Sequence, residues 1–180
     1  MSIYPEEARF LAIQGDLYVS AKKLEEGQTY YLRAARMGEP KYEVWARIIQ
    51  LDFELNAVQK ASTHAMEALK YFPAQGFLNF QLGFARYLQG DNQDAIRFLE
   101  IARSIIKPSE SWNVQLFSIM GDVYHALGRS KESDDAFDQV LVLNPMDEHV
   151  LNNYSYYLSL RKEQLAKAAS MSKRLVERYP

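Results

Sequence analysis

The sequence predicts an all-α fold in which antiparallel helical hairpins are stacked on one another. Apolar residues recur at helical spacing, as at Leu78, Leu82 and Ala85, and no strand-like alternation persists along the 180 residues. Prolines lack the backbone donor that a helix needs, so they mark helix ends. They are separated by 33, 35, 37 and 35 residues, a near-constant period that is typical of a helical repeat array. These prolines are Pro40, Pro73, Pro108, Pro145 and Pro180.

Small residues recur with nearly the same period, between the two predicted helices of each hairpin. Antiparallel helices cross closely only where side chains are small, so these residues mark the expected crossings. Large residues such as Tyr124 and Phe137 are expected to fill the space between hairpins, because one hairpin cannot bury its apolar face alone. The small residues are Gly27, Ala61, Ala95, Ser133 and Ala168.

This register divides the chain into five units: 8–41, 42–75, 76–109, 114–147 and 148–180. Four extra residues separate the third unit from the fourth, and the fifth unit has one extra residue in its loop. We expect one array over residues 1–180. We also expect it to be a fragment of a longer protein, because no polar capping helix follows the last unit.

The turns inside the third and fourth units carry glycine and polar helix caps. In "LQGDNQDA" the predicted N-cap of the second helix is Asp91 or Asn92, and in "LGRSKES" it is Ser130. Asp, Asn and Ser are favoured at this position because their side-chain oxygens accept an N–H group of the first turn.

The chain resembles the tetratricopeptide repeat (TPR) family, whose unit is a 34-residue helical hairpin. The fourth unit matches the family best, with Gly121, Phe137 and Pro145, whereas Ile49 and Ser155 replace the usual glycine in the second and fifth units. The resemblance implies a right-handed α-α superhelix, the TPR solenoid. It also implies a non-catalytic scaffold that binds a partner peptide or helix in its concave groove.

The third unit contributes four aromatic residues to the groove that the resemblance implies. In TPR proteins the first helix of each hairpin lines this groove. Aromatic anchors dominate many binding sites, so these four residues are one candidate partner site. The alternative is that some of them pack against neighbouring units. They are Phe77, Phe80, Phe84 and Tyr87.

The fourth and fifth units contribute mainly polar groups to the same implied groove. Asp122 and His125 come from the fourth unit, and Asn152, Asn153 and Tyr156 from the fifth, where His149 also lies at a groove position. Asparagine amides both donate and accept, and so can pair with the backbone of an extended peptide. The alternative is a polar surface that keeps the array soluble.

Signals for catalysis are poor, so we expect no enzyme activity, catalytic residue, metal or cofactor. The chain has no cysteine, which excludes thiolate chemistry and thiolate metal sites. It has no phosphate-binding glycine loop, dinucleotide fingerprint or nucleophile elbow. Asp122 and His125 share one helix face, but no third group completes a catalytic or metal site.

Charge and hydropathy narrow the expected partners to proteins or peptides. The net charge is −2 and the pI about 6.0, which argues against nucleic acid. No apolar run approaches the ~18 residues of a membrane span, so we expect no direct membrane insertion. An alternative function is a structural spacer or self-assembly segment of a larger bacterial envelope protein. In that case a homo-oligomer would form through the uncapped C-terminal hairpin.

The expected location of the protein stays open. The first residues, "MSIYPEEARF", contain no signal peptide. The closing segment resembles long bacterial TPR proteins, many of which are exported. The parent protein is therefore either exported to the periplasm or cytoplasmic.

Overall fold

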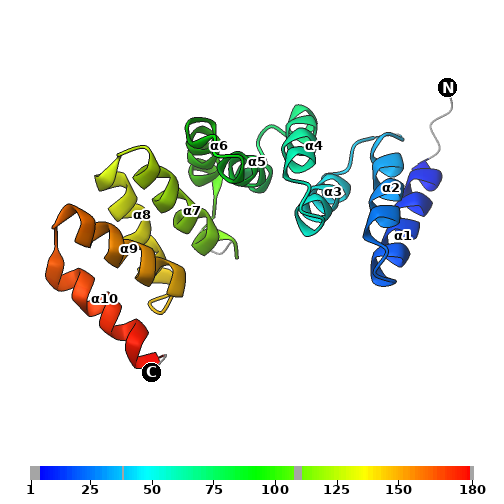
Figure 1. Cartoon of the computed structure of the whole chain (residues 1–180). Helices are drawn as coiled ribbons and strands as arrows, with labels where there is room; N and C mark the ends of the chain where they lie inside the picture. Colours follow the sequence, from blue (N-terminus) through cyan, green and yellow to red (C-terminus); the bar gives the residue numbers. More distant parts are fainter. Residues whose placement is uncertain (1–4, 38, 108–110, 179–180) are drawn as a thin grey trace. The chain divides into compact units, whose positions relative to one another are not determined.

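The computed structural model describes residues 5–37, 39–107 and 111–178, and every regular element in these ranges is an α-helix. Figure 1 shows the helices in chain order, with α1 beside α2, α3 beside α4, α7 beside α8 and α9 beside α10. The helices are α1 (Pro5–Ser20), α2 (Leu24–Ala35), α3 (Tyr42–Glu54), α4 (Val58–Tyr71), α5 (Gly76–Leu88), α6 (Asn92–Ile105), α7 (Asn113–Ala126), α8 (Ser130–Leu143), α9 (Glu148–Arg161) and α10 (Leu165–Arg178).

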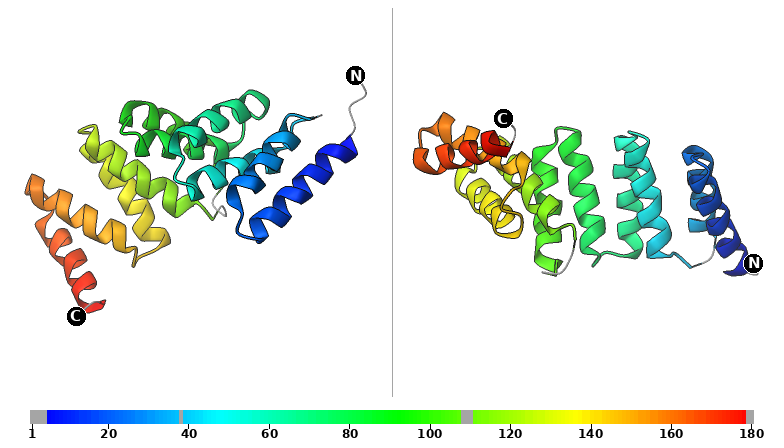
Figure 2. Two further views of the ribbon diagram at one scale, coloured as in Figure 1. Left: turned by 45° about the vertical axis from the view of Figure 1, so that its right-hand side comes forward. Right: turned by 90° about the horizontal axis from the view of Figure 1, so that it is seen from below.

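Two compact parts divide the chain: an N-terminal part, Met1–Gly90, and a C-terminal part, Asp91–Pro180. In the N-terminal part each helix from α1 to α5 packs on the next. In the C-terminal part each helix from α6 to α10 packs on the next, and α7 also contacts α9. Figure 2 shows the hairpins of each part from two further sides. The boundary lies inside the third expected unit, and the single array over 1–180 stays a prediction.

The crossing of α7 and α8 depends on the absence of a side chain at Gly121. A Cβ atom there would lie 2.4 Å from Cε1 of Phe137, whose ring is fully buried. Ser133, the small residue on α8, donates its hydroxyl to the Gly121 carbonyl oxygen at 2.8 Å. The predicted close crossing at Gly121 and Ser133 is therefore confirmed, with Phe137 packed directly against it.

In the second hairpin, α3 and α4 also pack closely, but the small buried residues at the crossing come from α4. Ile49 of α3 stands where glycine is usual, and it is fully buried. Ala61 and Ala65 of α4 are also fully buried, so they leave the room that Ile49 needs. Trp45 completes this core at 1% exposure.

The hairpin turns place a residue with left-handed backbone at a nearly constant interval. One positive φ angle recurs in each turn, at Lys22, Asn56, Gly90, Gly128 and Lys162, which are 34, 34, 38 and 34 residues apart. The last turn has a second one, at Gln164. The longer interval contains the four extra residues between the third and fourth units. Glycine adopts this conformation without strain, whereas lysine does so at a cost.

The N-caps agree with the sequence prediction at one turn and differ at the other. The Asp91 side chain caps α6 by accepting from the Asp94 N–H at 3.1 Å, as predicted. The prediction of Ser130 for α8 was wrong by one residue, because Arg129 is the N-cap residue and provides no side-chain cap. Asp147, which was not predicted, caps α9 by accepting from the Val150 N–H at 3.0 Å.

The predicted helix-ending prolines lie beyond the helices where they can be described. α2 ends at Ala35 before Pro40, α4 at Tyr71 before Pro73, and α8 at Leu143 before Pro145. Pro108 and Pro180 lie outside the described residues. Proline therefore stands where the helical pattern stops in three hairpins.

Candidate functional site

An aromatic face in the N-terminal part joins three of the predicted groove residues to a ring from α3. Phe77 lies 6.1 Å from Phe80, and Phe80 lies 6.3 Å from Phe84, measured between ring centroids. Phe84 lies 5.1 Å from Phe53 of α3. We define the aromatic face as Phe53, Phe77, Phe80, Phe84 and Tyr87.

Burial divides the aromatic face into core and surface. Phe80 is only 3% exposed, so its ring is part of the core. Phe77, Phe84 and Tyr87 are of intermediate exposure. The alternative to an exposed patch was that some of these rings pack against neighbouring units. Phe80, which is buried, and Phe84, which contacts Phe53, fit that alternative. Phe80 offers almost no side-chain surface to a partner.

A buried carboxylate organises the predicted residues of the C-terminal part. The Asp122 side chain on α7 is 7% exposed and accepts the Nε2–H of His149 on Oδ2 at 2.6 Å. Its other oxygen accepts Nδ2–H of Asn153 at 3.1 Å and the hydroxyl of Tyr157 at 3.3 Å. Burying a carboxylate is costly unless it is paired and hydrogen-bonded, and three groups from α9 meet that requirement.

His125 is also joined to α9, through a stacked ring. Its imidazole lies 3.5 Å from the Tyr157 ring, centroid to centroid, with 7° between the planes. Asp122 and His125 share one face of α7, as predicted, and both contact α9. The structure brings together four of the predicted residues: Asp122, His125, Asn152 and Asn153. The Asn152 amide donates to Asn153 Oδ1 at 3.2 Å, and His125 is linked to this group through Tyr157.

The outward side of α9 carries a row of polar and aromatic side chains, which we call the α9 stripe. Residues three, four, seven and eleven positions after His149 share one side of a helix. The opposite side holds the fully buried Val150, Leu151, Tyr154 and Leu158. Tyr156 and Leu160 are each 58% exposed, and Asn152 is exposed. The α9 stripe consists of His149, Asn152, Asn153, Tyr156 and Leu160.

The two histidines near Asp122 have pKa values shifted in opposite directions. The hydrogen bond to Asp122 raises the pKa of His149 above its usual 6.5, although partial burial opposes the shift. Burial against α9 lowers the pKa of His125, and the nearby Arg161 lowers it further. Near pH 6.5 the site thus favours a charged His149 beside a neutral His125.

The geometry contains an Asp–His pair but lacks the other parts of a catalytic or metal site. Within the described residues, no three His, Asp or Glu side chains are grouped so that they could hold a metal ion. A general base acts on a nucleophile or a substrate proton within hydrogen-bond reach. Over the same residues, His149 donates to Asp122, and the Asn153 amide nitrogen lies 3.2 Å from its Nε2. Nor is any of the described helices long and apolar enough to cross a membrane.

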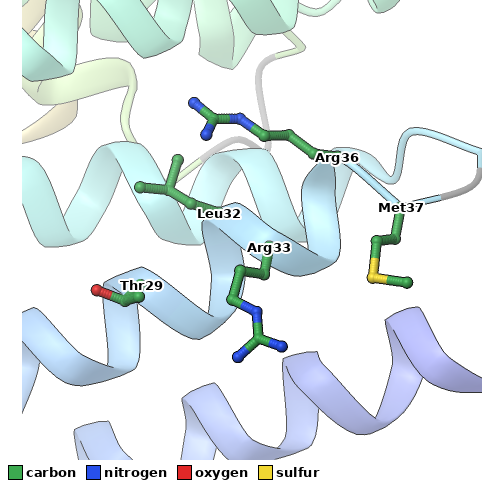
Figure 3. Close-up of a pocket in the computed structure, with 5 residues that line it drawn as sticks. All are labelled: Thr29, Leu32, Arg33, Arg36 and Met37. Carbon is green, nitrogen blue, oxygen red and sulfur yellow. The ribbon is translucent and has the colours of Figure 1, made fainter.

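Two hollows elsewhere on the surface lack a set of polar side chains that point toward a common centre. A hollow of about 370 Å³ beside α2 is lined by Thr29, Leu32, Arg33, Arg36 and Met37. Figure 3 shows the Arg33 and Arg36 side chains pointing away from each other, so they do not form one anion site. A second hollow, of about 440 Å³, is lined by Glu132, Asp135 and Asp138 of α8 together with Arg103 and three uncharged residues.

Two contributors to the site were not among the residues predicted from the sequence. Tyr157 faces Asp122, and only the packing of α7 on α9 reveals this contact. Leu160 is four residues after Tyr156, so the helical period alone would have placed it in the α9 stripe. His149 was assigned to a groove position, but its bond to the buried Asp122 could not be read from the sequence.

Comparisons with known proteins address the fold. Scans against models of protein families and against curated protein sequences found no match. Among solved structures, MamA (residues 41 to the end) from Desulfovibrio magneticus RS-1 is similar, with a TM-score of 0.83 at 16% identity, covering 98% of this chain and 96% of MamA.

Two further solved structures have the same kind of fold. YrrB, described as a TPR protein with an unusual peptide-binding site, has a TM-score of 0.77 at 16% identity, covering 94% of this chain and 85% of YrrB. PilF from Pseudomonas aeruginosa has a TM-score of 0.68 at 12% identity, covering 83% of this chain and 66% of PilF. The expected all-α fold is confirmed, and it is the solenoid fold of the tetratricopeptide repeat proteins.

Proposed function

We propose that the chain is a non-catalytic interaction scaffold that binds an extended peptide segment of a partner protein along the α9 stripe. The observation that carries this proposal is the Asp122 network, which holds His149 and Asn153 in place before any partner arrives. Side chains that are already ordered lose less entropy on binding. The peptide-binding site in the name of YrrB is a precedent on this fold.

The size and chemistry of the α9 stripe suit a short extended segment. His149 and Leu160 are 11 residues apart, so the stripe is roughly 16 Å long at about 1.5 Å per helical residue. That length corresponds to about five residues of an extended peptide. The amides of Asn152 and Asn153 supply donors and acceptors for a peptide backbone, and Tyr156 and Leu160 supply apolar surface.

The test uses the full chain and a phage-displayed library of random 12-residue peptides. Peptides selected on the wild-type chain are synthesised, and their affinities are measured for the Tyr156→Ala and Leu160→Ala variants. We expect each variant to weaken binding about tenfold, because truncating an exposed anchor costs more than about 1 kcal/mol.

The matched control is Val176→Ala, which removes an exposed apolar side chain from α10, outside the stripe. Val176 is 67% exposed, so its replacement should leave both folding and peptide binding unchanged. Peptides that bind all the stripe variants as tightly as the wild type would refute this location of the site.

Self-assembly is a second candidate function, and a different observation favours it. Phe10, Ile13 and Leu17 share one side of α1 and are 62%, 43% and 65% exposed. Exposed apolar rows of this kind often mark interaction sites. On α10, Ser172 holds the repeat position at which α8 has the fully buried Phe137, so α10 is more polar there than α8.

Self-assembly through α1 would make the apparent mass depend on concentration. Light scattering over a hundredfold dilution should then show dissociation, and Phe10→Ser with Leu17→Ser should give a monomer throughout. Leu165→Ser with Val176→Ser tests the C-terminal hairpin in the same way. A wild-type mass that is monomeric at every concentration would exclude this function.

A further inference from the structure

We propose that His149 binds an oxygen acceptor of the partner segment through its Nδ1–H, and that capture therefore depends on the proton that this imidazole carries. The inference rests on the function proposed above, because it concerns the same α9 stripe. It adds the chemical group that is recognised and a condition under which recognition fails.

The first step is that Asp122 determines which nitrogen of His149 faces the partner. Nε2 is 2.6 Å from Asp122 Oδ2, and a carboxylate is an acceptor, so Nε2 carries a hydrogen. Asn153 Nδ2 lies 3.2 Å from the same nitrogen but donates to Asp122 Oδ1 instead. Among the described residues, nothing hydrogen-bonds Nδ1 of His149.

The second step is that protonation reverses the hydrogen-bonding role of Nδ1. With Nε2–H held by Asp122, the neutral ring presents a lone pair at Nδ1 and accepts a hydrogen bond. The protonated ring presents Nδ1–H and donates one. The His149 side chain is 51% exposed, so a partner can reach it. A carbonyl or carboxylate oxygen therefore fits only the protonated ring.

The third step concerns the charges around His149, which keep the proton in place. From α7, Asp122 accepts from the ring, and at the start of α9 Asp147 adds a second negative charge. Arg178 of α10 is paired with Glu148 at 3.7 Å. Two carboxylates of α8 pair elsewhere: Asp134 with Arg161 at the far end of α9, and Asp138 with Lys167 of α10.

His125, the other titratable group on α7, does not compete in the same pH range. Its pKa is lowered by burial, whereas the pKa of His149 is raised by its bond to Asp122. As the pH rises above 6.5, His125 is therefore mostly neutral, whereas His149 still loses its proton there. A change in peptide affinity over this range therefore reports on His149.

The first experiment establishes the protonation state without a partner. Two-dimensional ¹H–¹⁵N NMR of the full-length chain between pH 5 and 9 should show His149 as the Nε2–H tautomer at high pH. The Asp122→Asn variant should move the titration midpoint of His149 to lower pH. A neutral His149 that carries its hydrogen on Nδ1 would overturn the inference.

The second experiment uses peptides selected from the random 12-residue phage library at pH 6 and then synthesised. Their affinity for the wild-type chain should fall about tenfold as the pH rises from 6 to 8.5, because a hydrogen bond from a charged donor is lost. The His149→Gln variant should bind with an affinity that does not change over this range. His149 is half exposed, so this variant should fold normally.

The outcomes separate this inference from the proposed function. Peptides that depend on Tyr156 and Leu160, but bind wild-type and His149→Gln chains with one pH profile, would leave the function standing and overturn the role of His149. Selected peptides that depend on no residue of the α9 stripe would overturn both.

Discussion

The aromatic residues of α5 and the residues of the α9 stripe occupy equivalent positions in the first helices of two units, yet they differ in burial. The aromatic residues are buried or half-buried, whereas most of the α9 stripe is exposed. The third and fifth units begin 72 residues apart, so Phe77, Phe80 and Phe84 correspond to His149, Asn152 and Tyr156. Phe80 is 3% exposed, whereas Asn152 is exposed. A repeat position therefore does not by itself decide whether a side chain is available to a partner.

The preceding first helix explains part of this difference in each part of the chain. α3 offers Phe53, which packs on Phe84, at the repeat position where α7 offers His125. α7 also carries Asp122, which draws His149, Asn153 and Tyr157 into hydrogen bonds. The apolar ring of Phe53 thus packs against Phe84, whereas the buried carboxylate of Asp122 forms hydrogen bonds with the polar side chains of α9.

The largest expected effect on stability comes from replacing Phe80 with alanine, compared with the same change at the equivalent position Asn152. Phe80→Ala should lower the free energy of unfolding by about 3–5 kcal/mol, because it empties a packed site. Asn152→Ala is the matched control and should change it by less than about 0.5 kcal/mol. Chemical denaturation followed by circular dichroism measures both. Equal losses would mean that burial does not distinguish the two faces.

A second pair of variants compares the helix crossings of the two parts. At Gly121 a Cβ atom would meet the fully buried Phe137 ring at 2.4 Å, so Gly121→Ala should destabilise the protein by about 2 kcal/mol. At Gly15 the nearest atoms belong to the Tyr31 ring at 3.0 Å. There the better helix propensity of alanine, worth about 1 kcal/mol, should offset most of the strain.

Thermal unfolding of the two glycine variants provides the measurement. Gly121→Ala should lower the melting temperature clearly, and Gly15→Ala should stay near the wild type. If Gly15→Ala proves the more damaging, the crossing in the first hairpin is tighter than the described geometry allows.

A smaller gain in stability is expected at the turns, where the sequence departs from glycine. Lys162 has φ 57° and Lys22 φ 62°, at the repeat position that holds Gly128 and Gly90 elsewhere. Glycine relieves left-handed strain of about 1 kcal/mol, so Lys162→Gly and Lys22→Gly should each raise the melting temperature slightly. Gly128→Lys, the reverse change, should lower it. A drop for both lysine variants would contradict a strained turn.

The smallest effect is the pH dependence of the bond between His149 and Asp122. The folded state raises the pKa of His149, so the extra stabilisation from the charged ring is fully present below pH 6.5 and is lost as pH rises through the raised pKa. The neutral ring keeps its Nε2–H bond to Asp122. Because His149 is half exposed, the difference in melting temperature between wild type and His149→Gln should be only about 1–3 °C at pH 5.5. It should be smaller at pH 9, and a difference that stays constant between pH 5.5 and 9 would contradict this account.

The sequence by itself determined the repeat and the chemistry that each unit carries. Prolines and small residues are spaced along the chain, and helical hairpins are local structures, so their period predicts the helices and the close crossing at Gly121. The sequence also predicted that α9 carries mainly polar residues at its outward positions. The N-cap of α8 was missed by one residue, since Arg129 and Ser130 both precede the apolar part of that helix.

Only the tertiary structure decided which of the predicted groove residues lie at the surface. Burial of Phe80 and the contact between Phe53 and Phe84 depend on packing between helices, and so do the bonds of Asp122 to His149 and Tyr157, 27 and 35 residues away. Such contacts join residues from different hairpins, and the spacing within one unit does not specify them. The physical reason is that a repeat encodes the contacts within a hairpin, whereas its neighbours determine whether an outward position is covered.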